Sequence, residues 1–569
     1  MKRIIGYCIA FLLLTAEVCG KQVKSDLSVL YVGGSPEIET MIHNPEPAVL
    51  EKSVRKRTAA FEKLLRRYFR NVEVVSARDY LPEMSDRYDV TIMDGTPREL
   101  QPAQEIVNEE GMIISRRNPA YLPEDFDRPM VFIAEAGDIV GTRIGVKTDW
   151  YCLCLDADAH HFNKEHPIFH GPFEVNISVE LKPTPSEAFR FVRTDGQPLP
   201  DSLEMWRVGY KTEEGFRPGM IARPWGFADS PDAEYISGGV SAKDIDAVAM
   251  GRHGNFFFWG FSASPENMTD EAQTVFANAV AYISKFAGQT PIARRYKSDI
   301  ATREYAVQQK DFISYKRWQE RMVVEKQYIE KTEEIKKVAL AKQAKGEKLT
   351  SEEKAALRST VKLQSYAEWL KSREPVLFEK FGDNEQAYKD YFDDNRDYFY
   401  GGDKVIYWMV DEDVKSWGIP NNDIRLLDKA IGCWERGEEV DKAKRVLTRY
   451  TLCRFATPQE WRDWYETNKD RIFFTESGGW FFMVNTRDLS VPGNDYRMRG
   501  QKIPGEDYRG EKRRVPETEA ALTSDKNPVY MEMKTEEAEN GNKWVVVKMN
   551  IHPGYHTYAR VASTDPYMP

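Results

Sequence analysis

Short apolar runs alternate with amphipathic segments along the first third of the chain. Residues 27–32, 72–75, 90–93 and 130–134 are apolar runs with the length of a buried strand. Between the first two, residues 50–70 place apolar side chains at helical spacing, with Lys and Arg between them. Strands separated by helix-length segments predict an α/β fold with a mainly parallel sheet wrapped by helices.

Two later segments complete this predicted domain, and a different pattern follows it. Residues 255–261 are a strongly apolar strand, and an amphipathic helix is expected from about 270 to 286. We therefore place the α/β domain at 26–288. Lys, Glu, Gln and Ala then dominate a stretch that we expect to be a charged helical spacer over 289–377, in the form of a hairpin or a short antiparallel coiled coil.

The remaining chain divides into three parts by composition. Residues 378–485 are rich in Trp, Tyr and Phe at helical spacing, which predicts a small α-helical domain with an aromatic core. Residues 486–527 are polar, with recurring Pro, Gly, Arg and Glu, and are expected to be a linker. Two strand-like runs joined by turn residues predict a β-hairpin within 528–569.

The N-terminus has the pattern of a signal peptide. Two basic residues precede an apolar run that is too short to span a bilayer, and cleavage after Gly20 would remove residues 1–20. The expected location is therefore periplasmic or secreted. A lipoprotein acylated at Cys19 is the alternative, but Val18 is bulkier than the residue that usually precedes such a cysteine. No other segment has the apolar length of a transmembrane helix.

Composition narrows the function classes further. The 569 residues carry 80 basic and 90 acidic side chains, a net charge of −10 that does not favour nucleic-acid binding. Six cysteines are too few for a disulfide-scaffold protein. A bridge between Cys433 and Cys453 stays open, because both lie on segments that are expected to be neighbouring helices.

One alternating segment concentrates potential metal ligands. Residues 151–161 put Cys152, Cys154, Asp156, Asp158 and His160 on one face of a predicted strand. Residues two apart on a strand can share one ion, so Asp156, Asp158 and His160 are the candidate ligands for Zn²⁺ or another divalent metal. The competing interpretation is a half-buried strand whose polar face meets solvent.

A second candidate site is the sequence Gly-Arg-His-Gly at 251–254. The glycines let the backbone approach a ligand, and Arg252 or His253 could act on a polar substrate. The alternative is a plain turn that precedes a strand. Glu135, at the turn after the predicted strand 130–134, is a candidate general base, with capping or a surface role as the alternative.

The α/β domain resembles the ThuA-like (trehalose-utilisation) branch of the class I glutamine amidotransferase-like fold. The resemblance is carried by residues 30–34, the His-Pro-Ile turn at 166–168, residues 251–261 and residues 278–283. It implies a carbohydrate-related polar ligand. The chain departs from the amidotransferase pattern, because the turn at 134–137 reads Ala-Glu-Ala-Gly, without the nucleophilic cysteine, and no His-x-Glu pair follows. Acyl transfer needs an activated nucleophile and a base, so we expect no glutaminase activity.

The tail at 528–569 resembles the start of the N-terminal, immunoglobulin-like domain of thiol:disulfide interchange reductases. Residues 544–551, 552–558 and 566–569 carry this resemblance. No cysteine lies after Cys453, which excludes thiol exchange through the tail. We expect a partial β module that a partner protein of the cell envelope could complete, since a lone hairpin is marginal in water.

Two function classes remain open. The first is an exported protein whose ThuA-like domain binds or processes a polar ligand; if it is an enzyme, it is hydrolase-like or carbohydrate-modifying. The second is a non-enzymatic scaffold or interaction protein with a degenerate amidotransferase-like domain. Convergence of Asp158, His160 and His253 in one pocket would favour the first class.

Overall fold

A computed structural model of the chain shows several cores. It describes residues 23–34, 46–107, 113–117, 119–141, 144–146, 152–189, 199–210, 219–224, 227, 230–241, 245–293, 303–401, 408–476, 479–488, 529–537 and 543–551. The expected signal peptide, nearly all of the expected linker and the last part of the tail lie outside these residues. The chain forms two compact units, Met1–Tyr508 and Arg509–Pro569.

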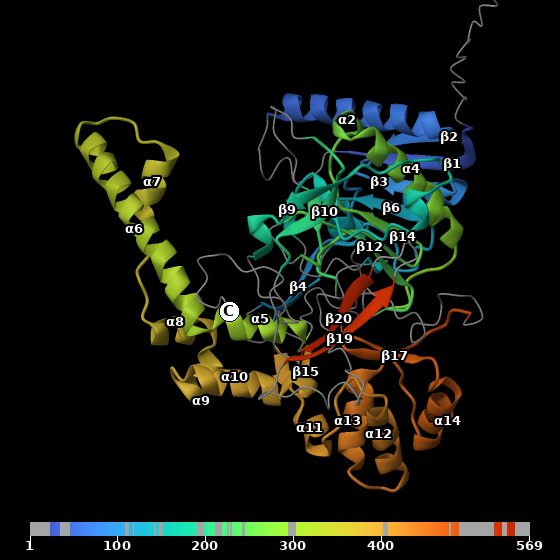
Figure 1. The fold of residues 1–569 in the computed structure, drawn as a ribbon, viewed down its shortest axis with the longest axis vertical. Helices are drawn as coiled ribbons and strands as arrows, with labels where there is room; N and C mark the ends of the chain where they lie inside the picture. Colours follow the sequence, from blue (N-terminus) through green and yellow to red (C-terminus); the bar gives the residue numbers. More distant parts are fainter. Residues whose placement is uncertain are drawn as a thin grey trace, which may run out of the picture. The chain divides into compact units, whose positions relative to one another are not determined.

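A ten-stranded mixed sheet organises the N-terminal region (Figure 1). Its order is β2-β1-β3-β6-β14-β13-β12-β8-β10-β9. The first five strands are parallel to one another: β2 (Phe69–Ser76), β1 (Ser25–Gly33), β3 (Val90–Met93), β6 (Met130–Ile133) and β14 (Phe256–Trp259). The other five are antiparallel: β13 (Val248–His253), β12 (Ala233–Gly239), β8 (Asp158–His160), β10 (Ser202–Arg207) and β9 (Val179–Pro183). The expected strands form the parallel half, whereas the expectation of a mainly parallel sheet missed the antiparallel half.

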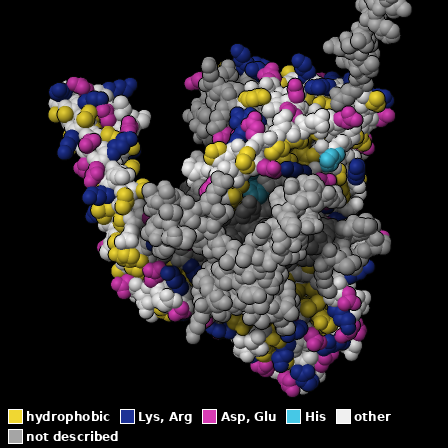
Figure 2. Space-filling model, in the orientation of Figure 1, with side chains coloured by type: hydrophobic (Ala, Val, Ile, Leu, Met, Phe, Trp, Pro, Cys, Tyr) yellow, Lys and Arg dark blue, Asp and Glu magenta, His cyan; other side chains and the backbone are white. Residues whose placement is uncertain are grey.

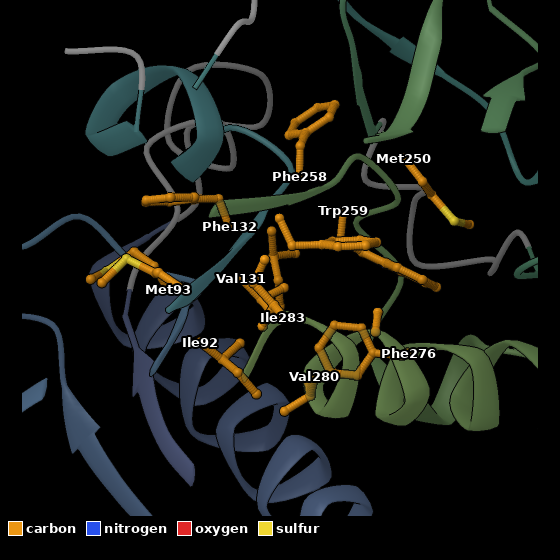
Figure 3. Packing of buried hydrophobic residues seen from close by; sticks show 14 of the residues in the cluster. Ile92, Met93, Val131, Phe132, Met250, Phe258, Trp259, Phe276, Val280 and Ile283 are labelled. Carbon is orange, nitrogen blue, oxygen red and sulfur yellow. The ribbon is translucent and has the colours of Figure 1, made fainter. Parts of the chain in front are cut away.

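Two helices cover the same face of the parallel half. These are α2 (Pro47–Tyr68) and α4 (Asp270–Ile283), close to the expected bounds. Thr269 caps α4 by accepting a hydrogen bond from the Ala272 amide, which satisfies a backbone donor that the first turn leaves unpaired. Figure 3 shows Trp259 lying beside Phe276 of α4, with ring centres 5.1 Å apart, while Phe258 points away from that helix. Every residue of β3, β6 and β14 is buried, which explains why these strands are continuous apolar runs.

Short elements complete the α/β region. Two strand pairs lie outside the main sheet: β4 (Gln104–Val107) with β5 (Ile113–Arg117), and β7 (Cys152–Leu155) with β11 (Gly219–Ile221). The short helices are η1 (Pro82–Arg87), the single π-helical turn η2 (Gly137–Gly141), η4 (Pro167–Phe169), η5 (Ser186–Phe189), η6 (Pro265–Asn267) and η7 (Ser284–Phe286).

The next region is helical, as the sequence predicts. Its helices are α5 (Glu304–Phe312), α6 (Tyr315–Ala344), α7 (Ser351–Arg358), α8 (Tyr366–Arg373), α9 (Pro375–Phe381), α10 (Glu385–Asp394), η8 (Arg396–Tyr398), α11 (Glu412–Trp417), α12 (Arg425–Glu435), α13 (Val440–Tyr450) and α14 (Pro458–Asn468). The expected helix start at Thr350 is confirmed: Thr350 and Glu353 form a reciprocal capping box. Two short hairpins accompany the helices, β15 (Phe399–Gly401) with β16 (Trp408–Val410) and β17 (Ile472–Thr475) with β18 (Phe481–Val484).

The aromatic residues form two cores rather than one. The first, centred on Trp369, Tyr388 and Phe392, also takes in Ile313 from before α6. The second gathers α12, α13 and Trp461 of α14. The first core therefore crosses the boundary at 377 that composition suggested.

The second unit contains the expected hairpin. Strands β19 (Val529–Glu537) and β20 (Lys543–Ile551) are antiparallel, with Val529 opposite Ile551 and Glu537 opposite Lys543. Among the described residues, no helix combines the length and apolar character that crossing a bilayer requires.

Candidate functional site

The turn that follows β6 places an alanine at the position where a nucleophile elbow would carry its reactive residue. Ala134 is fully buried and has a φ of 47°, a left-handed conformation that costs a non-glycine residue free energy. Its amide donates to the Trp259 carbonyl at 2.7 Å, which ties the turn to β14. A strained residue directly after a buried parallel strand is where such elbows present a nucleophile. Alanine has no nucleophilic atom to present there.

Glu135 and Gly137 follow Ala134 within the same turn. Glu135, the candidate general base, is 5% exposed and lies beneath the surface of the fold. Gly137 begins η2, and a Cβ at this position would lie 2.7 Å from the Phe258 ring. The segment after the elbow therefore packs directly on the sheet.

A buried ion pair lies at the same edge of the sheet, where β3 ends. Arg57 of α2 binds both oxygens of Asp94, with Nε–Oδ2 at 2.6 Å and Nη2–Oδ1 at 2.9 Å, and also donates to the Ser262 carbonyl. The Tyr31 hydroxyl donates to Asp94 at 2.5 Å. These contacts join β1, β3, α2 and the segment after β14. Asp94 was not among the candidate residues that the sequence pattern indicated, although its place directly after a predicted parallel strand is the usual location of functional groups.

Arg252 is held in an ion pair on the face of the sheet that α4 covers. It lies inside β13 rather than in a turn, opposite Glu234 of β12, and its Nε donates to Glu234 Oε2 at 2.8 Å. The same oxygen accepts a bond from the Tyr282 hydroxyl at 2.8 Å and faces His166 Nε2 at 3.5 Å. The guanidinium also stacks 4.0 Å from the centre of the Phe286 ring.

This cluster shifts the ionisation of its members. Burial opposes ionisation of Glu234, but Arg252 and His166 outweigh it and hold the pKa of that carboxyl well below its usual value. Burial, with the charge of Glu234, raises the pKa of the Tyr282 hydroxyl far above 10. Arg252 is 3% exposed. Its charge is therefore neutralised inside the protein, which leaves little capacity to grip an external anion.

His253 points to the opposite face of β13 and joins a second buried cluster. Its Nε2 lies 3.3 Å from Ser230 Oγ and 3.4 Å from Asp232 Oδ1, and its Nδ1 bonds to the Gly145 carbonyl. Ser230 donates to the same Asp232 oxygen at 2.8 Å. Burial opposes ionisation of Asp232, but the His253 charge lowers the pKa of the carboxyl far below its usual range, with a further contribution from Arg487.

This Ser–His–Asp group does not have the geometry of a catalytic triad. In a triad, the carboxylate binds one imidazole nitrogen and the serine hydroxyl the other. Here both Ser230 and Asp232 meet Nε2 of His253, and the hydroxyl points to the carboxylate. All three residues are at most 3% exposed. The cluster supports the fold and leaves no hydroxyl for attack.

The candidate metal ligands are divided between two strands. The single strand expected over 151–161 is broken at Asp156 and Ala157, so β7 and β8 belong to different sheets. Asp158 is held by Arg207, at 3.1 and 3.0 Å, and by Lys182 at 3.1 Å. The Asp156 carboxylate accepts a bond from the Ala157 amide.

His160 contacts another histidine rather than an acidic ligand. Its Nδ1 lies 2.8 Å from Nδ1 of His161, and burial, followed by the charge of His161, lowers the pKa of His160 well below its usual value. In the described part of the chain, no group of three or more His, Cys, Asp or Glu residues could hold a metal ion. Cys433 and Cys453 are free thiols, so the bridge that remained open between them does not form.

The structure does not bring the candidate residues together. On β12, His160 lies opposite Gly238 and His253 opposite Ala233, five positions apart, which is roughly 16 Å at the rise of a strand. Glu135 follows the carboxyl end of β6, whereas His253 precedes the turn into the amino end of β14, which runs parallel to β6. The predicted residues therefore occupy opposite ends and faces of the sheet.

An open groove of about 520 Å³ lies elsewhere on the α/β region. It lies between the start of β1, η4 and the end of α4. The described residues that line it are Ser25, Leu27, Pro167, His170, Gly171, Pro172, Ala281, Ser284 and Lys285. The predicted site residues are not among them. Comparison with protein families, with curated proteins and with solved structures found no match to this chain.

Proposed function

We propose that this chain is an exported, non-enzymatic scaffold or interaction protein built on a degenerate amidotransferase-like domain. The observation that carries the proposal is Ala134. The elbow keeps a strained, left-handed backbone after β6, but the residue at its apex is a methyl group with no reactive atom. Strained backbone positions are usually retained because they serve a catalytic or binding site. A strained turn without a nucleophile therefore fits a fold that no longer catalyses its original reaction.

The polar groups around the sheet support the same proposal. Arg252 is neutralised by Glu234, Asp158 by Arg207 and Lys182, and Asp94 by Arg57. Groups committed to such pairs stabilise the strands and helices that carry them. They would have to break those contacts before they could act on a substrate. In this proposal, the domain descends from a ThuA-like protein, as its resemblance to that branch implies.

An activity assay tests the proposal, with Glu135 as the ionisable residue of the turn that could still act as a base. The purified full-length chain is incubated with glutamine and with p-nitrophenyl esters and glycosides, and release of ammonia or nitrophenol is followed. We expect no turnover above buffer. Turnover that is lost in Glu135→Gln, the acid at the elbow, but kept in the matched surface variant Glu62→Gln would overturn the proposal.

A second candidate is binding of a polar, carbohydrate-related ligand without turnover. Asp94 and Glu135 favour it, because both follow carboxyl ends of parallel strands, where ligands of such sheets bind. A ligand that binds only the folded state raises the melting temperature with its concentration. A thermal-shift series with trehalose, glucose and galactose therefore separates the two candidates: a rise that Asp94→Asn abolishes favours the binding protein.

Export and the role of the tail are parts of the proposal that have their own tests. A mature N-terminus at Lys21, read by mass spectrometry, supports cleavage after Gly20; an acylated Cys19 supports the lipoprotein. The β19–β20 hairpin is proposed to pair with an envelope protein, since two strands alone bury too little apolar surface for stability.

A further inference from the structure

Helix α6 has one face that packs against its own chain. Thr332 and Ala339 are buried there. Trp318 donates to the Gln364 carbonyl at 3.0 Å, Lys336 to the Ser359 carbonyl at 3.3 Å, and Lys342 pairs with Glu353 of α7 at 2.6 Å. We call this side of the helix the covered face, because α7 and the segment that follows α7 pack against it.

Beside the covered face, α6 carries apolar side chains that stay in solvent. Val323, Val324, Tyr328 and Val338 are 51–59% exposed. Figure 2 shows hydrophobic side chains among charged ones along the α6–α7 hairpin. Val324, Lys331 and Val338 are seven residues apart, and Gln327, Glu334 and Ala341 follow each of them by three, which is the spacing of a coiled-coil seam. We call these six residues the open seam.

The charges beside this seam have no ion-pair partner among the side chains that the structure describes. Lys331, Glu334, Glu330 and Lys337 are exposed, and none of the ion pairs between described residues involves them. Charged residues elsewhere on the same helix do pair, such as Arg321 with Glu325 at 2.7 Å. The unpaired charges and the exposed apolar residues therefore share one face of α6.

We propose that the open seam binds the open seam of a second copy of this chain, with the two α6 helices antiparallel. In the register that we assign, Lys331 faces Glu334 of the second copy, and Val324 faces Ala341 of the second copy. Because two identical helices in antiparallel orientation are related by a two-fold axis, each of these contacts occurs twice. On the two flanks, Glu330 meets Lys337 of the other copy and Tyr328 meets Ile335 of the other copy.

Charge complementarity decides the orientation. In a parallel, in-register pair, Lys331 would face Lys331 and Glu334 would face Glu334, and like charges at a seam repel. The antiparallel register turns each of those contacts into an attraction. It also brings together the apolar residues at the two ends of the seam. The same face is therefore complementary to itself in one orientation only.

The composition of the seam sets the strength of this association. Lys331, Glu334 and Gln327 take core positions, and polar residues there specify register at a cost in stability. We therefore expect a weak dimer whose ion pairs are screened by salt. This association does not depend on the proposed function of the α/β domain, because it uses no residue of that domain.

Sedimentation equilibrium of the full-length chain at 50 mM and 500 mM NaCl tests the proposal. We expect a monomer–dimer equilibrium whose dissociation constant rises at least tenfold at the higher salt. Lys331→Glu and Glu334→Lys should each weaken the dimer by at least tenfold, because each creates like-charge contacts. The double variant should restore it. An equimolar mixture of the two single variants should also associate. In a parallel pair each single substitution would only exchange one like-charge contact for another, so the loss of affinity in the single variants is what distinguishes the antiparallel pair.

The matched control is Lys326→Glu, an exposed position on the same helix that lies off the seam and should leave the dissociation constant unchanged. Circular dichroism checks that each variant keeps its helix content. A chain that stays monomeric at every concentration overturns the proposal, as does a dimer that is indifferent to both single substitutions. A dimer that Lys326→Glu weakens as strongly as Lys331→Glu overturns the assigned face.

Discussion

Replacing Arg252 by Met tests whether this residue stabilises the fold or serves a ligand. The substitution keeps much of the aliphatic contact with Phe286 but removes the charge that neutralises Glu234. Removing one partner of a buried ion pair costs about 3–5 kcal/mol, because the other charge stays buried. Glu234 keeps its bond from Tyr282, and its side chain is 22% exposed. We therefore expect the lower end, about 3 kcal/mol.

Urea unfolding followed by tryptophan fluorescence measures this loss, since Trp206 and Trp259 are buried in the core of the same sheet. Hydrogen exchange of the β12 and β13 amides provides a local readout that the other cores of the chain do not affect. Glu234→Gln in the Arg252→Met background should recover much of the loss, because it removes the orphaned charge.

The control for this pair is an exposed ion pair of the same domain. Arg66 and Glu62 on α2 are 2.8 Å apart with side chains 50% and 40% exposed, so Arg66→Met should cost about 0.5 kcal/mol or less. The reasoning fails if Arg252→Met lies within about 1 kcal/mol of the wild type, or if the double variant is no more stable than Arg252→Met alone.

Three further outcomes follow from the buried clusters. The pKa of Glu234 in the folded state lies well below 4.5. The stability that this carboxylate contributes is therefore complete above pH 4.5 and is lost as the pH falls through the folded pKa. The urea midpoint should drop on acidification, and Glu234→Gln should reduce that drop. Asp232→Asn should cost about 2–4 kcal/mol by chemical denaturation, because it leaves His253 without its counter-charge. Dialysis against EDTA should leave the melting temperature unchanged, because Arg207 already holds the Asp158 carboxylate; a fall that added Zn²⁺ reverses would contradict this.

The local pattern of the sequence predicted the parallel half of the sheet and its covering helices. Strands β1, β3 and β6 are short apolar runs, and α2 repeats its apolar residues at helical spacing. The antiparallel half was missed because β12 contains Ser and two glycines and no continuous apolar run. Its residues are strand-forming only because they pair with β13 and β8.

By itself, the sequence determined that the turn after β6 has no nucleophile, because the identity of residue 134 needs no coordinates. Only the tertiary structure decided what the other candidates do. Arg252 and Glu234 are 18 residues apart in the chain, and His253 and Gly145 are 108 apart. Periodicity reports contacts within a few residues, whereas the partner of a charge depends on how distant strands register and on which face each side chain lies. A slip of one position in β13 would exchange the surroundings of Arg252 and His253, and no local pattern fixes that choice.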